Sequence, residues 1–330
     1  MRWSARLLWL GIAFAACSQA VRRGDAVVDT TATKTSLPVD GMPDLKKRIW
    51  IMPFGVPSGA ENITGKNIPA QTSDGEAPEP INVNKIATRL HRRLIEVFPS
   101  DKTPYLVQSP EDEEAFRSVG IDDMKDPKDV AKALKGSDIT GFLFGKITKI
   151  EAIEGAKDSE GLIRKRNYEL QISVKYELYD TNGGRRVAGT ESKQIYHESR
   201  SEVLGMSESA GIADQNERLL EMVPALADKI LTWASGYAGK LAWYGRVLRI
   251  DGGRLYLSAG RRTGLMVGDV LKVLESNRDI VDPQTGMYVG PAPGRMKGTV
   301  KVVQYFGVDG SMAVLQSAGG ILPDDRVELY

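Results

Sequence analysis

Apolar residues recur three or four positions apart in several stretches of the first two thirds of the chain. In residues 84–98 this spacing predicts a helix with one buried face, and Asn82 or Asn84 can cap its first turn. Three further helices are predicted, one opening at Ser109-Pro110, one at Asp126-Pro127 and one over 219–234. Pro224 lies inside the last pattern, so either that helix kinks there or a new helix begins there.

Strict alternation marks the clearest strand, residues 168–178, in which apolar side chains face one way and polar side chains the other. Asp180–Gly184 then predicts a turn, and 186–197 returns as the partner strand. Further strand patterns occupy residues 48–54, 105–107 and 139–153. Residues 156–166 are charged and lack alternation. Strands and helices in this order predict an α+β fold with helices packed on a sheet.

No helical period follows the small-residue stretch 236–239. Short apolar runs separated by Gly-rich turns predict strands at 244–250, 254–257, 270–274, 298–306 and 311–315, with 321–329 closing the chain. Many short strands of this kind predict a small all-β barrel. The polar stretch 55–80, rich in Pro and Gly, is interpreted as a loop insertion.

The first residues have the parts of a secretory signal. Arg2 and Arg6 precede an apolar run, 7–16, which is too short to span a bilayer because a spanning helix needs about 20 residues. Small residues then lead to Cys17, the only cysteine of the chain. This end of the run resembles the bacterial lipobox, although Phe14 stands where Leu is usual. The alternative is cleavage after Ala20, which leaves no lipid.

The residue after Cys17 is Ser18 rather than Asp. If Cys17 carries the lipid, the resemblance to bacterial lipoproteins implies a periplasmic protein that is anchored to the inner leaflet of the outer membrane. Several acyl chains on one residue are sufficient for stable anchoring.

Composition narrows the function classes. The 330 residues suffice for two domains, and 44 Lys and Arg balance 43 Asp and Glu. Removing residues 1–16 takes away two arginines and no acid, which leaves 42 bases against 43 acids. Such a balance argues against nucleic acid as a partner. One cysteine and two histidines exclude a disulfide framework and offer few ligands for zinc.

Two glycine-containing segments resemble catalytic loops only superficially. Residues 59–67 have one residue too many for a phosphate-binding loop, and Asn67 replaces the hydroxyl that would hold magnesium. Residues 205–209 lack the second glycine of a nucleophile elbow and the strand before it. The sequence therefore predicts no catalytic residue, no cofactor and no metal site.

Isolated polar residues have structural interpretations. His91 is expected to be exposed on a charged helix flank, and His197 next to Glu198 could act as a general base, but no nucleophile spacing supports this. Arg261 and Arg262 could bind phosphate or a carboxylate, yet a solvated loop is the preferred interpretation.

Two family resemblances follow from these motifs. "IWIMPF" at 49–54, the helix at 84–98 and "GSDITGFLFGKITKI" at 136–150 resemble the CsgG-like periplasmic domain. Residues 245–303, with "GRVLRIDGGRLYLSAG", "TGLMVGD", "DPQTG" and "GTVKVV", resemble the C-terminal domain of flagellar assembly protein T. The predicted organisation is a lipoprotein signal peptide at 1–16, a flexible tether at 17–45, a CsgG-like α+β domain at 46–239 and the barrel domain at 240–330.

The resemblances imply a non-enzymatic envelope scaffold that assembles around the flagellar basal body, with flagellar ring or motor components as partners. The subunits could form a homo-oligomeric ring through edge-to-edge contact of the α+β domain. The alternative is a CsgG-like secretion component or an activator of peptidoglycan synthesis. A pore needs amphipathic strands of about 9–11 residues, and the charged segment 156–166 disfavours it.

Overall fold

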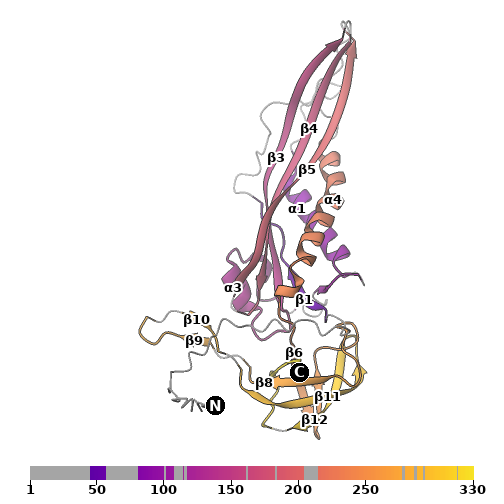
Figure 1. The fold of residues 1–330 in the computed structure, drawn as a ribbon. Coiled ribbons are helices and arrows are strands. Elements are labelled where there is room, and N and C mark those ends of the chain that lie inside the picture. Colours follow the sequence, from indigo (N-terminus) through magenta and orange to yellow (C-terminus); the bar gives the residue numbers. More distant parts are fainter. Residues whose placement is uncertain are drawn as a thin grey trace, which may run out of the picture. The chain divides into compact units, whose positions relative to one another are not determined.

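The computed structural model describes residues 45–56, 81–99, 102–107, 114, 117–160, 163–182, 184–203, 215–276, 279–285, 288–292, 294–317 and 319–330. These residues form a mixed sheet with helices and a closed six-stranded barrel (Figure 1). The predicted α+β class with a small all-β barrel is therefore confirmed, while the resemblance of the first domain to a CsgG-like domain stays a prediction.

The sheet has five strands in the order β2-β1-β3-β4-β5. β1 pairs in parallel with both β2 and β3, while β3, β4 and β5 are antiparallel to one another. The bounds are β1 (Lys47–Ile51), β2 (Tyr105–Val107), β3 (Gly141–Glu160), β4 (Ile163–Asp180) and β5 (Arg185–Val203). β2 and β5 thus form the two edges of the sheet.

The helices begin where the sequence predicts caps. In α1 (Val83–Val97) the Asn82 side chain accepts a hydrogen bond from Lys85 N at 2.9 Å. Of the two predicted candidates, Asn82 and Asn84, the cap is therefore Asn82. α3 (Pro127–Ala133) has Pro127 in its first turn and the Asp126 side chain as its cap. α4 (Gln215–Ser235) is one helix with Pro224 inside it. Two short 3₁₀ turns are η2 (Ile121–Asp123) and η3 (Ala238–Lys240). The helix predicted from Ser109 begins outside the described residues.

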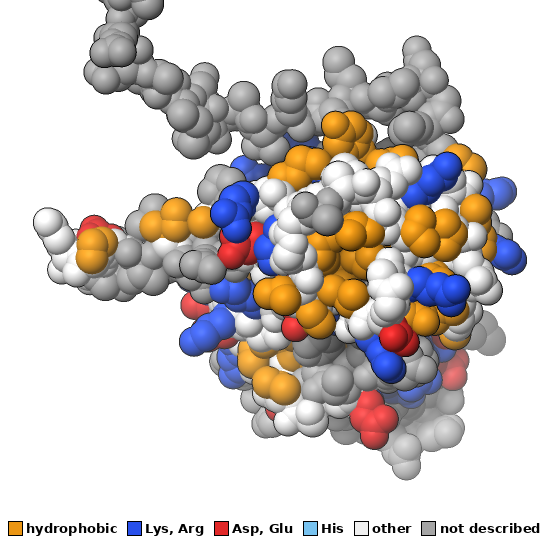
Figure 2. Space-filling model, turned by 90° about the horizontal axis from the view of Figure 1, so that it is seen from below, with side chains coloured by type: hydrophobic (Ala, Val, Ile, Leu, Met, Phe, Trp, Pro, Cys, Tyr) orange, Lys and Arg blue, Asp and Glu red, His pale blue; other side chains and the backbone are white. Residues whose placement is uncertain are grey.

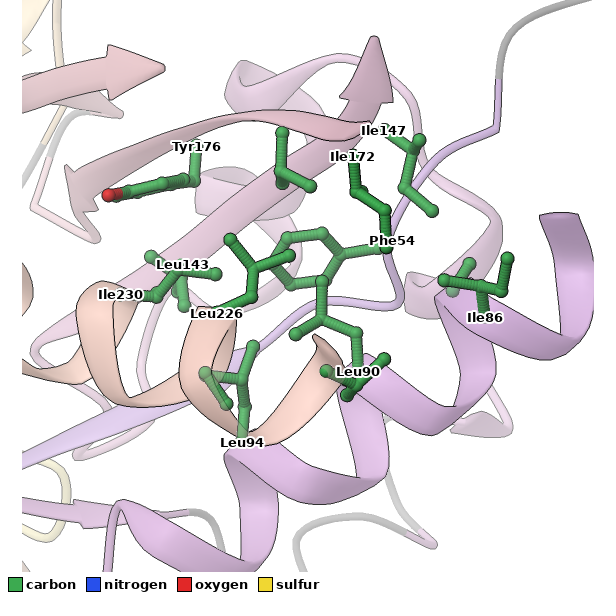
Figure 3. Packing of buried hydrophobic residues seen from close by; sticks show 14 of the residues in the cluster. Phe54, Ile86, Leu90, Leu94, Leu143, Ile147, Ile172, Tyr176, Leu226 and Ile230 are labelled. Carbon is green, nitrogen blue, oxygen red and sulfur yellow. The ribbon is translucent and has the colours of Figure 1, made fainter. Parts of the chain in front are cut away.

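One face of the sheet packs against α1 and α4. Figure 3 shows side chains from both helices and from the strands pointing toward one another, and the labelled residues are all almost fully buried. Phe54 covers Gly145 so closely that an added Cβ would lie 2.3 Å from its ring. The other face buries a smaller cluster with α3 and η2. Burial of these apolar side chains is the main stabilising contribution to this part of the fold.

The strands β3 and β4 are longer than the sequence pattern predicts. They pair from Gly141 with Asp180 as far as Glu160 with Ile163, so the charged segment 156–166 lies in this hairpin apart from residues 161 and 162, which are not described. The strand predictions, which ended at residue 153 and began again at 168, were therefore too short. Pairing with β4 satisfies the backbone of β3 without an alternating pattern. In Figure 1 these strands continue beyond the end of α4.

The barrel closes in the strand order β11-β12-β7-β6-β13-β8. Its strands are β6 (Gly245–Asp251), β7 (Arg254–Leu257), β8 (Val270–Leu274), β11 (Met296–Phe306), β12 (Gly310–Ser317) and β13 (Arg326–Leu329). A separate hairpin, β9 (Asp279–Val281) with β10 (Tyr288–Pro291), flanks the predicted turn at 282–286. The sequence pattern did not predict these two strands.

Candidate functional site

Several residues singled out in the sequence lie outside the described residues. They are Cys17, the glycine-containing segments 59–67 and 205–209, and most of the 55–80 insertion. The role of Cys17 therefore stays a prediction from the sequence motif.

The two histidines have different environments. His91 is half-buried and its Nε2 lies 2.9 Å from the Ile51 carbonyl oxygen, so the expectation of an exposed side chain was wrong. His197 is exposed, and its Nδ1 lies 3.4 Å from Oε1 of Glu169, its cross-strand neighbour on β4. The acid closest to the ring is thus Glu169 rather than Glu198. Because both side chains of this pair are open to water, it lacks the enclosed setting of a general base.

The loop of Arg261 and Arg262 is held rigidly by Asp309. The Asp309 carboxylate accepts hydrogen bonds from Gly260 N at 3.1 Å, Thr263 N at 3.0 Å and Thr263 Oγ1 at 2.6 Å. The Arg261 guanidinium lies 4.9 Å from the centre of the Tyr305 ring. Both arginines remain exposed.

Asp309 also connects this loop to the sheet. Arg48 on β1 donates to Asp138 and, at 3.0 Å, to Oδ2 of Asp309. The side chain of Arg48 is 17% exposed and both carboxylates are 8% exposed. Because a guanidinium can bind two carboxylates at once, Arg48 ties strand β1 to the barrel through charge-assisted bonds in a largely water-free setting.

Two more titratable groups lie near this connection. The hydroxyl of Tyr244 donates to the Ile139 carbonyl oxygen at 2.8 Å, and burial raises the pKa of that hydroxyl. Burial also raises the pKa of Asp180, against the opposing effects of its bond from Asn182 N and of the nearby Arg185 and Arg326. The Tyr244 bond thus links the start of the barrel domain to the residues before β3, whereas burial disfavours the charged form of Asp180.

Strand β5 is the longer edge of the sheet, with 19 residues. Its side chains alternate between exposed and half-buried from Glu191 to Ser199, as expected for one open face. Lys229 of α4 donates to the Lys193 carbonyl oxygen at 3.0 Å, which shows that this carbonyl points away from β4. Ile195, two positions on, therefore also directs its backbone groups to the open edge.

The outer surface of the barrel over β8 and β13 consists of paired charges. Lys272 lies opposite Glu328 with an N–O distance of 2.9 Å, and Arg326 contacts the same carboxylate at 2.8 Å. The Arg326 guanidinium also lies 4.1 Å from the centre of the Tyr244 ring. We call Lys272, Arg326 and Glu328 the paired wall.

The outer surface over β7, β12 and the end of β11 is apolar. Ser311 and Ala313 face the interior of the barrel, so Met312 and Val314 face outward, half-buried. Tyr256 is the register partner of Met312, and its ring meets that of Phe306 edge-on with centroids 5.4 Å apart. We call Tyr256, Phe306, Met312 and Val314 the apolar wall.

Cations adjoin the apolar wall at three register positions. Arg249 lies opposite Tyr256, while Arg254 and Lys301 lie opposite Val314 on its two sides. All three are exposed and form what we call the cationic rim. One acid, Asp251, lies 3.8 Å from Arg249. Figure 2 shows apolar side chains gathered in the middle of this view, with Lys and Arg, and some Asp and Glu, around them.

Sequence reasoning did not predict the apolar wall. Its signal is the run Met312–Leu315, which is apolar at every position instead of at every second one. A strand with one face in a core needs only alternation, so continuous apolar residues indicate a second covered face.

Among the described residues there is no group of three or more His, Cys, Asp or Glu side chains that could hold a metal ion. No helix in the described part of the chain is long and apolar enough to cross a membrane.

No family model matches the chain, and no curated protein matches it. Among solved structures, a Helicobacter pylori homolog of a neuraminyllactose-binding hemagglutinin is 11% identical with a TM-score of 0.36, covering 62% of this chain and 98% of its own. Lipoprotein GNA1162 from Neisseria meningitidis is 15% identical with a TM-score of 0.23 (56% and 99% covered). A minor lipoprotein from Acinetobacter baumannii is 10% identical with a TM-score of 0.24 (58% and 93% covered). These scores are too low to assign this chain a fold family or a function.

Proposed function

We propose that the protein is a non-enzymatic scaffold of the bacterial envelope, anchored through a lipid on Cys17 to the inner leaflet of the outer membrane. Strand β5 carries this proposal, because an edge of 19 residues offers a long row of backbone donors and acceptors for another chain. A second copy of the protein is the proposed first partner, joined edge to edge so that a closed ring forms.

The flagellar basal body is our candidate for the machine around which the scaffold assembles, with its ring or motor components as partners. The support is the resemblance of residues 245–303 to the C-terminal domain of flagellar assembly protein T. Clean deletion should reduce swimming and remove density from the motor. Normal swimming with intact motors would refute this choice of machine.

A secretion component is the alternative that one observation favours, because β3 and β4 form a hairpin of 20- and 18-residue strands. Against it, seven of the 13 residues in 154–166 are charged, which does not suit a strand facing lipid. A secretion defect with normal motility in the deletion strain would favour the alternative.

The edge-strand proposal is tested by Ile195→Pro. Proline removes the backbone N–H that Ile195 directs to the open edge, and proline is tolerated at such edge positions. The full chain should then lose self-association in analytical ultracentrifugation while its unfolding midpoint stays close to that of the wild type. Ile195→Thr keeps the N–H and should associate normally. Unchanged association of the proline variant would overturn the proposal.

A further inference from the structure

We propose that the apolar wall and cationic rim of the barrel dock on the anionic surface of a phospholipid bilayer. The inference rests on the proposed anchoring through Cys17, and it adds a second contact between the protein and the membrane. Apolar side chains surrounded by Lys and Arg match the boundary between acyl chains and anionic headgroups.

The position of the chain's entry into the fold favours a membrane as the occupant. Leu45 is 4% exposed within the hydrophobic core of the barrel, and Lys46 N donates to the Thr263 carbonyl oxygen at 2.8 Å. Only 27 residues separate Leu45 from Cys17. Fully extended, that length spans at most about 90 Å, and a flexible chain of that length averages about 30 Å. The lipid on Cys17 would therefore hold the barrel at a high local concentration beside the bilayer.

Charge distinguishes the two outer surfaces of the barrel. In the paired wall, Lys272 and Arg326 both contact Glu328. In the cationic rim, one acid, Asp251, accompanies Arg249, while Arg254 and Lys301 flank Val314. The rim holds three cations to one acid and the paired wall two cations to one acid, so the positive excess is larger at the rim. At the rim this excess also adjoins apolar side chains, a combination that is complementary to the boundary of an anionic bilayer.

Vesicle flotation tests this inference without the lipid anchor. The chain starting at Ser18 retains all the described residues and carries no acyl group. It should float with vesicles of phosphatidylethanolamine and phosphatidylglycerol, float far less with phosphatidylcholine alone, and dissociate as salt rises. Arg254→Gln with Lys301→Gln should weaken binding about 30-fold, since each cation near an anionic surface contributes about fivefold. Met312→Ser with Val314→Ser should also abolish flotation.

Lys272→Gln is the matched control, because it removes one cation from the paired wall and should leave flotation unchanged. The exposed rim residues can be replaced without disturbing the core, so Arg254→Gln with Lys301→Gln keeps the test valid even if the serine variants unfold. Absence of flotation, equal binding to both vesicle types, or equal effects of the control and the rim variants would overturn the inference. Loss of protein–protein association instead of flotation in the wall variants would also overturn it, in favour of a protein partner. Palmitate labelling of Cys17 is a separate readout, so anchoring and docking can fail independently.

Discussion

The two outer walls of the barrel are both built from antiparallel strands, but they present different side chains to the outside. On the paired wall, each charged side chain has an opposite charge within 2.9 Å, so these charges are paired within the chain. On the apolar wall, Met312 and Val314 face outward between cations, and their strand is apolar on both sides. A surface with satisfied charges needs no partner, whereas an apolar surface with a cationic rim is complementary to something outside the chain.

The largest expected effect on stability comes from breaking a buried ion pair between β11 and the residue that precedes β13. Lys297 Nζ lies 2.8 Å from both carboxylate oxygens of Asp325, and these side chains are 7% and 4% exposed. Asp325→Ala leaves a buried ammonium without its partner, which should lower the free energy of unfolding by about 3–5 kcal/mol. Urea denaturation measures the change.

Lys272→Gln is the comparison for that measurement. Its pair with Glu328 is partly exposed, so the loss should stay below about 1 kcal/mol. If Asp325→Ala lowers the free energy of unfolding no more than Lys272→Gln does, burial of the Lys297–Asp325 pair has no energetic consequence.

A smaller effect on stability is expected on the apolar wall. Met312→Ser with Val314→Ser should cost less than about 2 kcal/mol, because both side chains lie on the outer face of the barrel and are only partly buried. The same variant should lose vesicle binding, so these two residues should matter for binding more than for the stability of the fold. A loss of stability as large as that of Asp325→Ala would mean that these residues belong to the core.

The smallest effect concerns pH. Burial raises the pKa of Asp180 above its ordinary value of 3.8, so the folded protein holds this proton more tightly than the unfolded chain does. Stability should therefore fall as pH rises from that value through the raised pKa, and the penalty is fully present above it. Asp180→Asn keeps an oxygen for Asn182 N and should remove this dependence. Parallel pH profiles of stability for both proteins would contradict the assigned cause.

Strong periodicity explains what the sequence could predict. In α1 and in residues 168–178 one face is buried, so the pattern alone identifies the element and its inner side. The extension of β3 through 156–160 was missed because this segment pairs with β4 but lacks the alternation from which strands were predicted. β9 and β10 are three and four residues long, too short for a period to appear.

The contacts of Arg48 and the apolar wall could not be predicted from the sequence, for a different reason. Arg48 meets Asp138 and Asp309, which are 90 and 261 positions away, so no local pattern connects them. Tyr256, Phe306 and Met312 come from three strands and become a surface only when the barrel closes. Cys17, by contrast, is recognised only from its motif, since it lies outside the described residues.

The contrast between the two walls can be measured on the acylated chain bound to vesicles. Spin labels are placed at Met312→Cys on the apolar wall or at Lys272→Cys on the paired wall, where Arg326 and Glu328 stay paired, and Cys17, the one native cysteine, is occupied by lipid. The account predicts that the label at 312 becomes more accessible to oxygen and less accessible to a water-soluble nickel complex, while the label at 272 does not change. Equal accessibility of both labels to nickel, or protection at 272 alone, would contradict it.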